Sequence, residues 1–205
     1  MDGQGSSDWN ASVVLRGRHV SLEPLQPAHA QALREAEADG ELSRLWFTSV
    51  PKADAVEEYI RVALDGQGAG SDQPFVVRDA DGTIVGCTRY CRMEPANQRL
   101  EIGYTWYARR VQRTALNTEA KLLLLTHAFE ILGCIAVEFR TNWFNHRSRS
   151  AIARLGAKQD GVLRNTQRLP GGGFRDTVVF SIIESEWPTV KHHLQYQLDR
   201  RGVKP

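Results

Sequence analysis

The pattern of apolar and polar residues along this chain changes between two periods, which separates predicted strands from predicted helices. Segments with the features of strands, such as the alternation in 13–25 and the β-branched residues in 134–141, cover 13–25, 74–78, 83–93, 100–107, 134–141, 157–169 and 174–183. Apolar residues three or four positions apart, typical of amphipathic helices, occur in 27–39, 52–65, 117–132, 145–155 and 184–199. The order β-α-α-β-β-β-α-β-α-β-β-α predicts an α+β fold, with a mixed, largely antiparallel sheet covered by helices.

Turn-forming residues stand at the boundaries of these segments. Pro27 suits the first turn of the first helix, and Gly40, Gly133 and Gly156 follow the ends of helices. Asp81-Gly82 is typical of a tight turn between antiparallel strands. The predicted elements therefore have consistent starts and ends.

The chain of 205 residues has a suitable length for one well-buried domain. We assign this domain to 12–199, with a flexible segment at 1–11 and a tail at 200–205. Apolar residues make up 41% of the chain and charged residues 24%, which is ordinary for a globular protein.

Charge and cysteine usage exclude several classes of protein. A net charge of +2, with Lys and Arg spread along the chain, argues against nucleic-acid binding. No apolar stretch approaches the roughly 20 residues of a membrane span, and the start of the chain is too polar for a signal peptide. Cys87, Cys91 and Cys134 lack metal-like spacing, as do the adjacent His192 and His193. We expect a cytoplasmic protein with reduced thiols and no metal, nucleic-acid or membrane partner.

The segment from Leu100 to Lys121 carries the clearest functional signal. Its sequence, LEIGYTWYARRVQRTALNTEAK, predicts an aromatic strand, a short basic turn and the start of a long apolar helix. This order directs backbone N–H groups and the positive end of a helix dipole at one spot, which favours phosphate binding. Side chains that could assist are Arg109, Arg110, Gln112, Arg113, Asn117 and Thr118. The segment predicts a site for an acyl carrier that contains pyrophosphate.

Together with other motifs, this segment resembles the GNAT superfamily of acetyl-CoA-dependent N-acetyltransferases, and in particular its Rim-type branch, which includes acetylases of ribosomal-protein N-termini. The motifs are EIGYTW at 101–106, QRTALNTEAK at 112–121, NHRSRSAIARLGA at 145–157, FRDTVVFSI at 174–182 and SEWPTVK at 185–191. The resemblance covers most of 13–195. It implies the GNAT fold, with a twisted, mostly antiparallel sheet of about seven strands flanked by helices, and acetyl-CoA as the cofactor.

The predicted phosphate loop departs from the family pattern Q/R-x-x-G-x-G/A. It reads Gln112-Arg113-Thr114-Ala115-Leu116-Asn117, so side chains occupy both glycine positions. Glycine allows close approach of the backbone to phosphate and positive φ angles. Alanine is the smallest replacement, and asparagine tolerates left-handed geometry and suits the N-cap of a helix. We expect the loop to bind phosphate still.

The resemblance also assigns residues to the cofactor. Thr105, Trp106 and Tyr107 would flank the pantetheine arm, and the amides from Arg113 to Thr118 would hold the phosphates, with Thr118 adding a hydroxyl donor. We also assign Gln112 and Asn145 to the cofactor site. Arg149 and Arg147 would reach the ribose phosphate or simply solvate a helix end.

Two residues are candidates for proton transfer. Glu101, at the start of the strand that borders the cofactor, would accept the proton of the amine, with Glu138 as the second candidate. The alternative for Glu101 is an exposed strand carboxylate or a partner for Arg99. Some Rim-type relatives carry a functional glutamate where this chain has Gln167. Many members of the family use a tyrosine to protonate the leaving thiolate, and this chain has Ile152 at that position. The resemblance to Rim-type relatives, which carry a serine in N-x-x-S, instead implies this role for Ser148, three residues after Asn145. Asn145 also suits the N-cap of that helix.

The expected acceptor is a primary amine of a protein N-terminus, a lysine or a small molecule, which attacks the thioester directly. Trp46 and Phe47, in a predicted loop between the first two helices, would border it. The main alternative is a catalytically weak or inactive acyl-CoA-binding module of the same fold, and the next is an interaction domain without a cofactor. Relatives of this family also form homodimers, so a homodimer is a further expectation.

Overall fold

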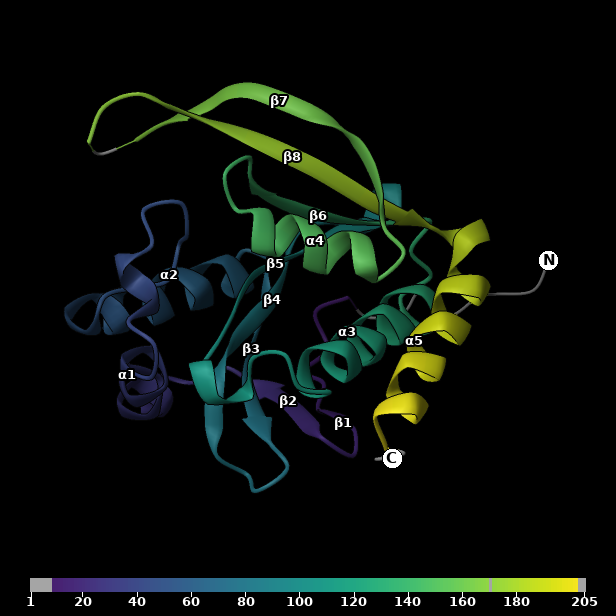
Figure 1. The fold of residues 1–205 in the computed structure, drawn as a ribbon, viewed down its shortest axis with the longest axis horizontal. Helices are drawn as coiled ribbons and strands as arrows, with labels where there is room; N and C mark the ends of the chain where they lie inside the picture. Colours follow the sequence, from purple (N-terminus) through teal and green to yellow (C-terminus); the bar gives the residue numbers. More distant parts are fainter. Residues whose placement is uncertain (1–8, 170, 203–205) are drawn as a thin grey trace.

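The computed structural model describes residues 9–169 and 171–202, which form one eight-stranded sheet with helices on both faces (Figure 1). The strand order is β1-β2-β3-β4-β5-β6-β8-β7. The strands are β1 Leu15–Arg16, β2 Val20–Pro24, β3 Gln73–Asp79, β4 Ile84–Glu94, β5 Arg99–Tyr107, β6 Ala136–Asn142, β7 Lys158–Arg168 and β8 Phe174–Ile183. The predicted α+β class, with a mixed and mostly antiparallel sheet, is confirmed.

The pairing of β5 with β6 is the one parallel pairing in the described sheet, and it is short. Its register joins Arg99, Leu100 and Glu101 to the segment 136–138. Beyond Glu101 the two strands separate, while β5 stays paired with β4 and β6 stays paired with β8. The sheet therefore opens at its centre, next to the second half of β5.

Helices cover the two faces of the sheet. They are α1 Ala30–Ala38, α2 Val56–Gly68, α3 Leu116–Thr126, α4 His146–Arg154 and α5 Trp187–Gly202. In β4, the Arg89 guanidinium lies 5.3 Å from the ring centroid of Tyr59 in α2, whereas the Tyr90 hydroxyl donates to the Leu124 carbonyl in α3 at 2.7 Å. Because successive residues of a strand point to opposite faces, α2 and α3 cover opposite faces of the sheet.

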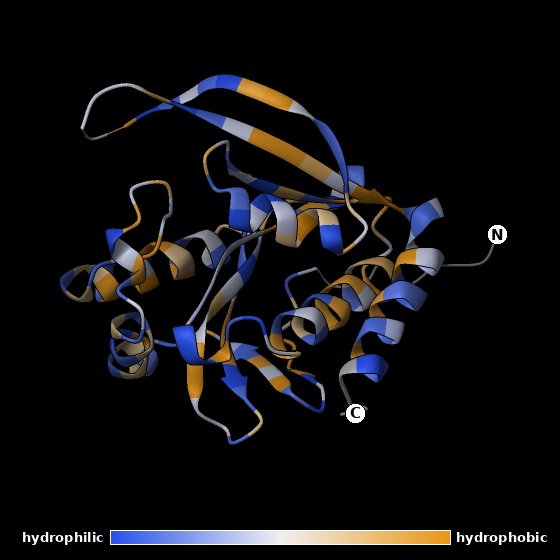
Figure 2. Cartoon of the chain, viewed as in Figure 1, coloured by the Kyte–Doolittle hydropathy of each residue, from blue (hydrophilic) through white to orange (hydrophobic). Residues whose placement is uncertain are grey.

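Apolar side chains of both layers form one continuous core. Its largest fully buried members are Phe75 and Tyr90 of the central strands and leucines such as Leu22, Leu33 and Leu124. Figure 2 shows apolar residues along α3 and α5 where these helices lie side by side over the sheet. This core fixes β4 and β5, the strands that lead to the opening.

The structure corrects the expected first strand. Instead of one strand over 13–25, β1 and β2 form a hairpin whose turn contains Gly17. The backbone amides of Arg18 and His19 donate to the buried Glu119 carboxylate of α3, at 2.9 Å and 2.5 Å. The sheet consequently has eight strands where about seven were expected.

The ends of the domain also differ in part from the expectation. Trp9 is buried in the core, and the Ala11 carbonyl accepts a hydrogen bond from the Gln73 side chain at 2.6 Å. The described part of the expected flexible segment 1–11 is therefore attached to the domain, and 1–8 lies outside the described residues. The last helix continues to Gly202, past the expected end at 199.

Candidate active site

The predicted strand-turn-helix is present and begins at the opening of the sheet. The strand β5 ends at Tyr107, a short turn spans Arg109–Val111, and α3 begins at Leu116. Within β5, Tyr104 has a φ angle of 51°, and the register with β4 shifts near this point. Such an irregularity bends the strand locally.

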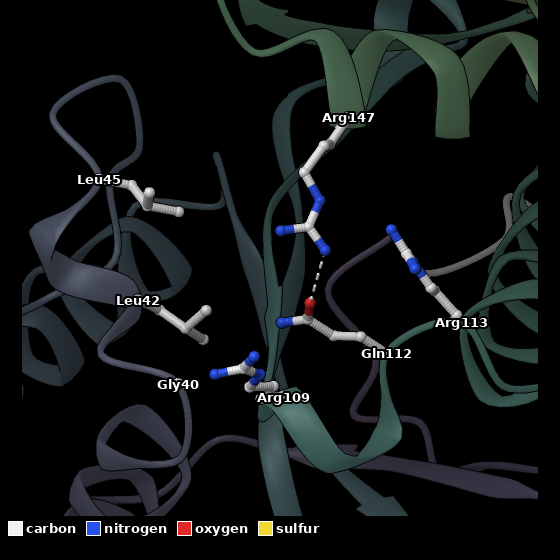
Figure 3. Close-up of a pocket in the computed structure, with 7 residues that line it drawn as sticks. All are labelled: Gly40, Leu42, Leu45, Arg109, Gln112, Arg113 and Arg147. Carbon is white, nitrogen blue, oxygen red and sulfur yellow. Dashed lines mark hydrogen bonds between the residues drawn. The ribbon is translucent and has the colours of Figure 1, made fainter.

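A cavity of about 570 Å³ lies in front of this turn (Figure 3). Arg109 and Arg113 border it from the turn, and Arg147 reaches it from the first turn of α4. The Arg147 guanidinium donates to the Gln112 side-chain oxygen at 3.1 Å. The remaining lining residues are Gly40, Leu42 and Leu45, from the connection between α1 and α2. Three guanidinium groups near a helix N-terminus make this cavity suitable for an anionic ligand.

The loop reaches its shape without glycine. Arg113 has a φ angle of 64° and takes up the left-handed conformation, whereas Ala115 has a φ of −68° and lies in the right-handed helical region. The position of the first family glycine therefore needs no positive φ here. Ala115 is the N-cap residue of α3, so the expected N-cap role of Asn117, which lies inside the helix, is wrong.

Side chains of the loop also hold it in place. The Gln112 amide donates to the Tyr107 carbonyl at 2.8 Å, and the Thr114 hydroxyl donates to the Val111 carbonyl at 2.7 Å. Leu116 and Thr118 are buried, and the Thr118 Oγ1 has no hydrogen-bond partner among the described residues. Because the Thr118 side chain has no exposed surface, its hydroxyl is not among the groups that line the cavity.

The residues assigned to the pantetheine arm have mostly buried side chains. Trp106 and Tyr107 are buried, so their backbone, rather than their rings, would border a ligand. The Thr105 hydroxyl accepts a hydrogen bond from the Lys121 ammonium at 2.7 Å and lies 2.7 Å from the Thr88 hydroxyl. Burial lowers the pKa of Lys121 to about 7, because the charged form loses its hydration. This lysine of α3 therefore supports β5 just after its bend.

Helix α4 contributes on the other side of the opening. Asn145 is its N-cap, because its side-chain oxygen accepts from the Ser148 amide at 3.0 Å. Ser148 is half-buried, and its hydroxyl makes no hydrogen bond with the described residues. Arg149 lies over the Trp143 ring at 4.2 Å and donates to the Trp143 carbonyl, whereas Arg147 lines the cavity. Of the two arginines, Arg147 is the one that lines the cavity, whereas the Arg149 Nε is buried without a hydrogen-bond partner among the described residues.

Glu101 lies at the last paired position of β5 before the opening, in a network of charges. Its Oε2 is 3.2 Å from Arg92 Nε and 3.6 Å from Arg140 Nε. Arg140 also pairs with Glu138 at 2.9 Å, and Glu138 pairs with Arg99. Burial raises the pKa of Glu101 above its ordinary value, although the arginines oppose this shift. A second cavity of about 150 Å³ adjoins the network and is lined by Arg92, Glu94, Arg99, Leu100, Glu101, Glu138 and Arg140.

Trp46 and Phe47 belong to an aromatic cluster that sequence analysis identified only in part. Their rings meet edge to face, with centroids 5.5 Å apart, and Trp46 also lies 5.5 Å from Phe144. Trp46 and Phe144 are both more than half exposed. Phe144 lies between β6 and α4, so the cluster joins two loops on either side of the opening. No sequence signal connects residues 46 and 144, which explains why Phe144 was missed.

Other features of the chain have plain structural roles. All three cysteines are free and buried. Among residues 9–169 and 171–202, no group of His, Cys, Asp and Glu side chains could hold a metal ion. In the same part of the chain, none of the helices combines the length and apolarity needed to cross a membrane.

Comparisons with known proteins identify the family and the fold. The family model described as "Acetyltransferase (GNAT) domain" matches residues 19–158. The chain is 28% identical to "Putative ribosomal N-acetyltransferase YdaF" of Bacillus subtilis (strain 168), over 82% of this chain and 93% of YdaF. A GCN5-related N-acetyltransferase from Brucella melitensis is 30% identical, with a TM-score of 0.81, 92% of this chain and 86% of that chain covered.

Mycobacterium smegmatis RimJ, solved in complex with CoA-disulfide, shares the fold at 22% identity, with a TM-score of 0.74, 91% of this chain and 93% of that chain covered. The family match spans more than half of the chain. The protein therefore belongs to the GNAT family of acetyltransferases, as the motifs predicted.

Proposed function

We propose that this protein transfers the acetyl group of acetyl-CoA to a primary amine by direct attack of the amine on the thioester. The observation that carries the proposal is the cavity at the N-terminus of α3, where Arg109, Arg113 and Arg147 meet next to the opened strand β5. The complex of the M. smegmatis relative with CoA-disulfide supports CoA as the ligand class. The pyrophosphate would lie against residues 112–118, and the pantetheine arm would run along β5 toward Glu101.

The proposed reaction needs a neutral amine, because an ammonium group has no lone pair for attack. Glu101 is the proposed acceptor of that proton, and its raised pKa brings it closer to the operating pH that favours a general base. The amine nitrogen then bonds to the acetyl carbon, and the negative charge of the tetrahedral intermediate is stabilised by a backbone N–H of β5.

The intermediate collapses when its carbon–sulfur bond breaks. The thiolate of CoA leaves with the electron pair and takes a proton, for which the free hydroxyl of Ser148 is the proposed donor. A thiol pKa near 8.5 makes this step undemanding, so the serine would contribute one or two orders of magnitude. The products are the N-acetylated amine and CoA.

Calorimetry with CoA and thiol release from acetyl-CoA test the proposal together. Micromolar CoA binding should add about 4 kcal/mol to the free energy of unfolding at millimolar ligand. Ala115→Glu should abolish binding, because it puts a carboxylate against the pyrophosphate, whereas the matched neutral variant Ala115→Gln should retain more of it. An amine panel of peptides, polyamines and aminoglycosides should then identify the acceptor by thiol release.

Each negative result has a distinct meaning. CoA binding without thiol release for any amine would favour the alternative, an acyl-CoA-binding module without catalysis. An unchanged melting temperature in millimolar CoA would contradict both functions. Equal CoA affinity in Ala115→Glu and the parent would place the pyrophosphate elsewhere.

A further inference from the structure

Charged side chains around the second cavity lie on one face of the sheet. Directly paired residues of neighbouring strands share a face, and Glu101 pairs with Glu138 of β6. Glu138 in turn pairs with Ser181 of β8, and Arg140 pairs with Val179. Arg175 lies four residues before Val179 in β8, nearer the hairpin tip. Because the spacing is even, its side chain faces the same side of the sheet as that of Val179. It is close enough to Glu101 and Tyr104 to interact with both electrostatically.

The guanidinium groups on this face have unequal numbers of carboxylate partners. Arg140 pairs with both Glu138 and Glu101, and Arg99 pairs with Glu138. Arg92 pairs with Glu101 alone, through the Oε2 atom. Arg175 forms no ion pair with the described carboxylates, and its Nε is buried without a hydrogen-bond partner. A buried donor without a partner is costly, which makes it a position where a ligand acceptor atom is expected.

Binding of an acceptor amine would change these ion pairs. If Glu101 binds the ammonium group, as the proposed function requires, its negative charge can no longer fully neutralise Arg92. Arg140 keeps Glu138, whose Oε2 accepts from its Nε and Nη2 at 3.1 Å and 2.9 Å. Arg92 and Arg175 are then two guanidinium groups without a full carboxylate partner beside the bound amine. An anionic group on the acceptor itself would compensate both.

We propose that the acceptor is an amine that carries a carboxylate close to the amino group, and that Arg92 and Arg175 bind this carboxylate while Glu101 binds the amine. This inference rests on the proposed function and specifies its substrate. The cavity of about 150 Å³ has room for one small polar group, because a water molecule in the liquid takes up roughly 30 Å³. A free amino acid and a peptide with an acidic residue near its N-terminus both present this chemistry.

Thiol release from acetyl-CoA with matched acceptors tests the proposal and separates the two sources. One arm compares a free amino acid with its α-amide, alanine against alaninamide, and the other compares peptide amides that begin Ser-Glu and Ser-Gln. In each pair only the carboxylate differs. A hydrogen bond between charged groups supports an expected preference of about tenfold to a hundredfold in kcat/KM for the acidic member of at least one pair. The arm that shows the preference identifies the source.

Variants of the arginines complete the experiment. Arg175→Gln and Arg92→Gln should each reduce the preference, mainly through KM for the acidic acceptor. Because both arginines also lower the pKa of Glu101, the quantity compared is the ratio of kcat/KM for the acidic and the neutral acceptor, and not the absolute rate. Arg168→Gln is the matched control, because Arg168 lies on the same hairpin but stacks on Phe174 at 5.1 Å. Equal rates for acidic and neutral members in both arms would overturn this inference and leave the acetyltransferase proposal standing. A preference that both variants retain would also overturn it, whereas absence of thiol release with every amine would contradict the proposed function itself.

Discussion

The two cavities beside β5 use the same residue type in opposite ways. At the N-terminus of α3, Arg109 and Arg147 make no ion pair with the described carboxylates, and the nearby helix end adds a further positive potential. At the start of β5, Arg92, Arg99 and Arg140 each pair with a glutamate. The first region has a permanent excess of positive charge, while the second is close to neutral.

This difference matches the two proposed ligands, because the charge of the pyrophosphate is fixed and the charge of the acceptor amine changes. A pyrophosphate keeps its charge throughout the reaction, so exposed arginines and oriented amides can bind it without titrating. An amine must lose a proton, and a carboxylate among balanced charges can accept it without leaving a large net charge buried. Variants in the two regions test this division, and the expected loss of activity decreases from Glu101 to Lys121.

Glu101→Gln should have the largest effect, because it removes the proposed proton acceptor from the second cavity. We expect kcat to fall by about 10²–10⁴, the usual contribution of general base catalysis, with no change in CoA affinity. Steady-state kinetics and calorimetry measure the two quantities. Glu94→Gln is the control, since Glu94 lines the same cavity and is bonded to Asn97 on the surface. Equal losses in both variants would show that Glu101 is only structural.

Arg147→Ala and Arg109→Ala should each weaken CoA binding by about tenfold to a hundredfold, because each removes one charge-assisted contact. The matched control is Arg110→Ala, whose guanidinium turns away from the cavity to pair with Asp79 at 2.8 Å. Calorimetry at two salt concentrations should show a smaller salt dependence in the first two variants only. If Arg110→Ala weakens binding as much as the others, the effect comes from overall charge and not from the cavity.

Ser148→Ala should lower kcat by about tenfold and leave CoA affinity nearly unchanged, because thiolate protonation is an easy step. The Asn145 cap should survive, since it uses the backbone amide of Ser148. The neighbouring variant Ser150→Ala, at an exposed position of α4, is the control. An unchanged kcat in Ser148→Ala would leave protonation to water.

Lys121→Met should have the smallest effect on turnover and CoA affinity, and its effect should be visible in stability instead. The pKa of Lys121 is lowered to about 7 in the folded protein, so between pH 7 and 10.5 the unfolded chain binds more protons. The free energy of unfolding should therefore rise with pH in this window, by up to about 1.4 kcal/mol per unit, and the penalty should be constant below pH 7. Denaturant unfolding at pH 7 and pH 9 should show a smaller rise in the variant, and an identical rise would contradict the assignment.

Sequence patterns predicted the elements whose signals are local. The capping of α4 by Asn145 and the strand-turn-helix at 100–121 depend on neighbouring residues, and both are present. The hairpin of β1 and β2 was missed because alternation continues through its turn, and the stabilising partner Glu119 is about 100 residues away. The opening between β5 and β6 has no local sequence signal, because it depends on where two separate strands stop pairing.

Side-chain direction was the harder part of the site. Arg147 and Arg149 belong to the same helical turn, and the sequence gives no reason to prefer either. The Trp143 ring and carbonyl hold Arg149, so Arg147 alone reaches the cavity. The partners of Glu101 come from β4 and β6, so its environment could not be read from the surrounding sequence.

The short contact between β5 and β6 makes the sheet two half-sheets joined by a seam of a few residues. Past that seam, main-chain groups along the gap lack a neighbouring strand to pair with. A ligand with amide groups of its own can act as the missing strand and connect the halves. If the proposed CoA binds in this way, it would hold the two half-sheets together. Its release after each turnover would then loosen the centre of the molecule as well as its surface.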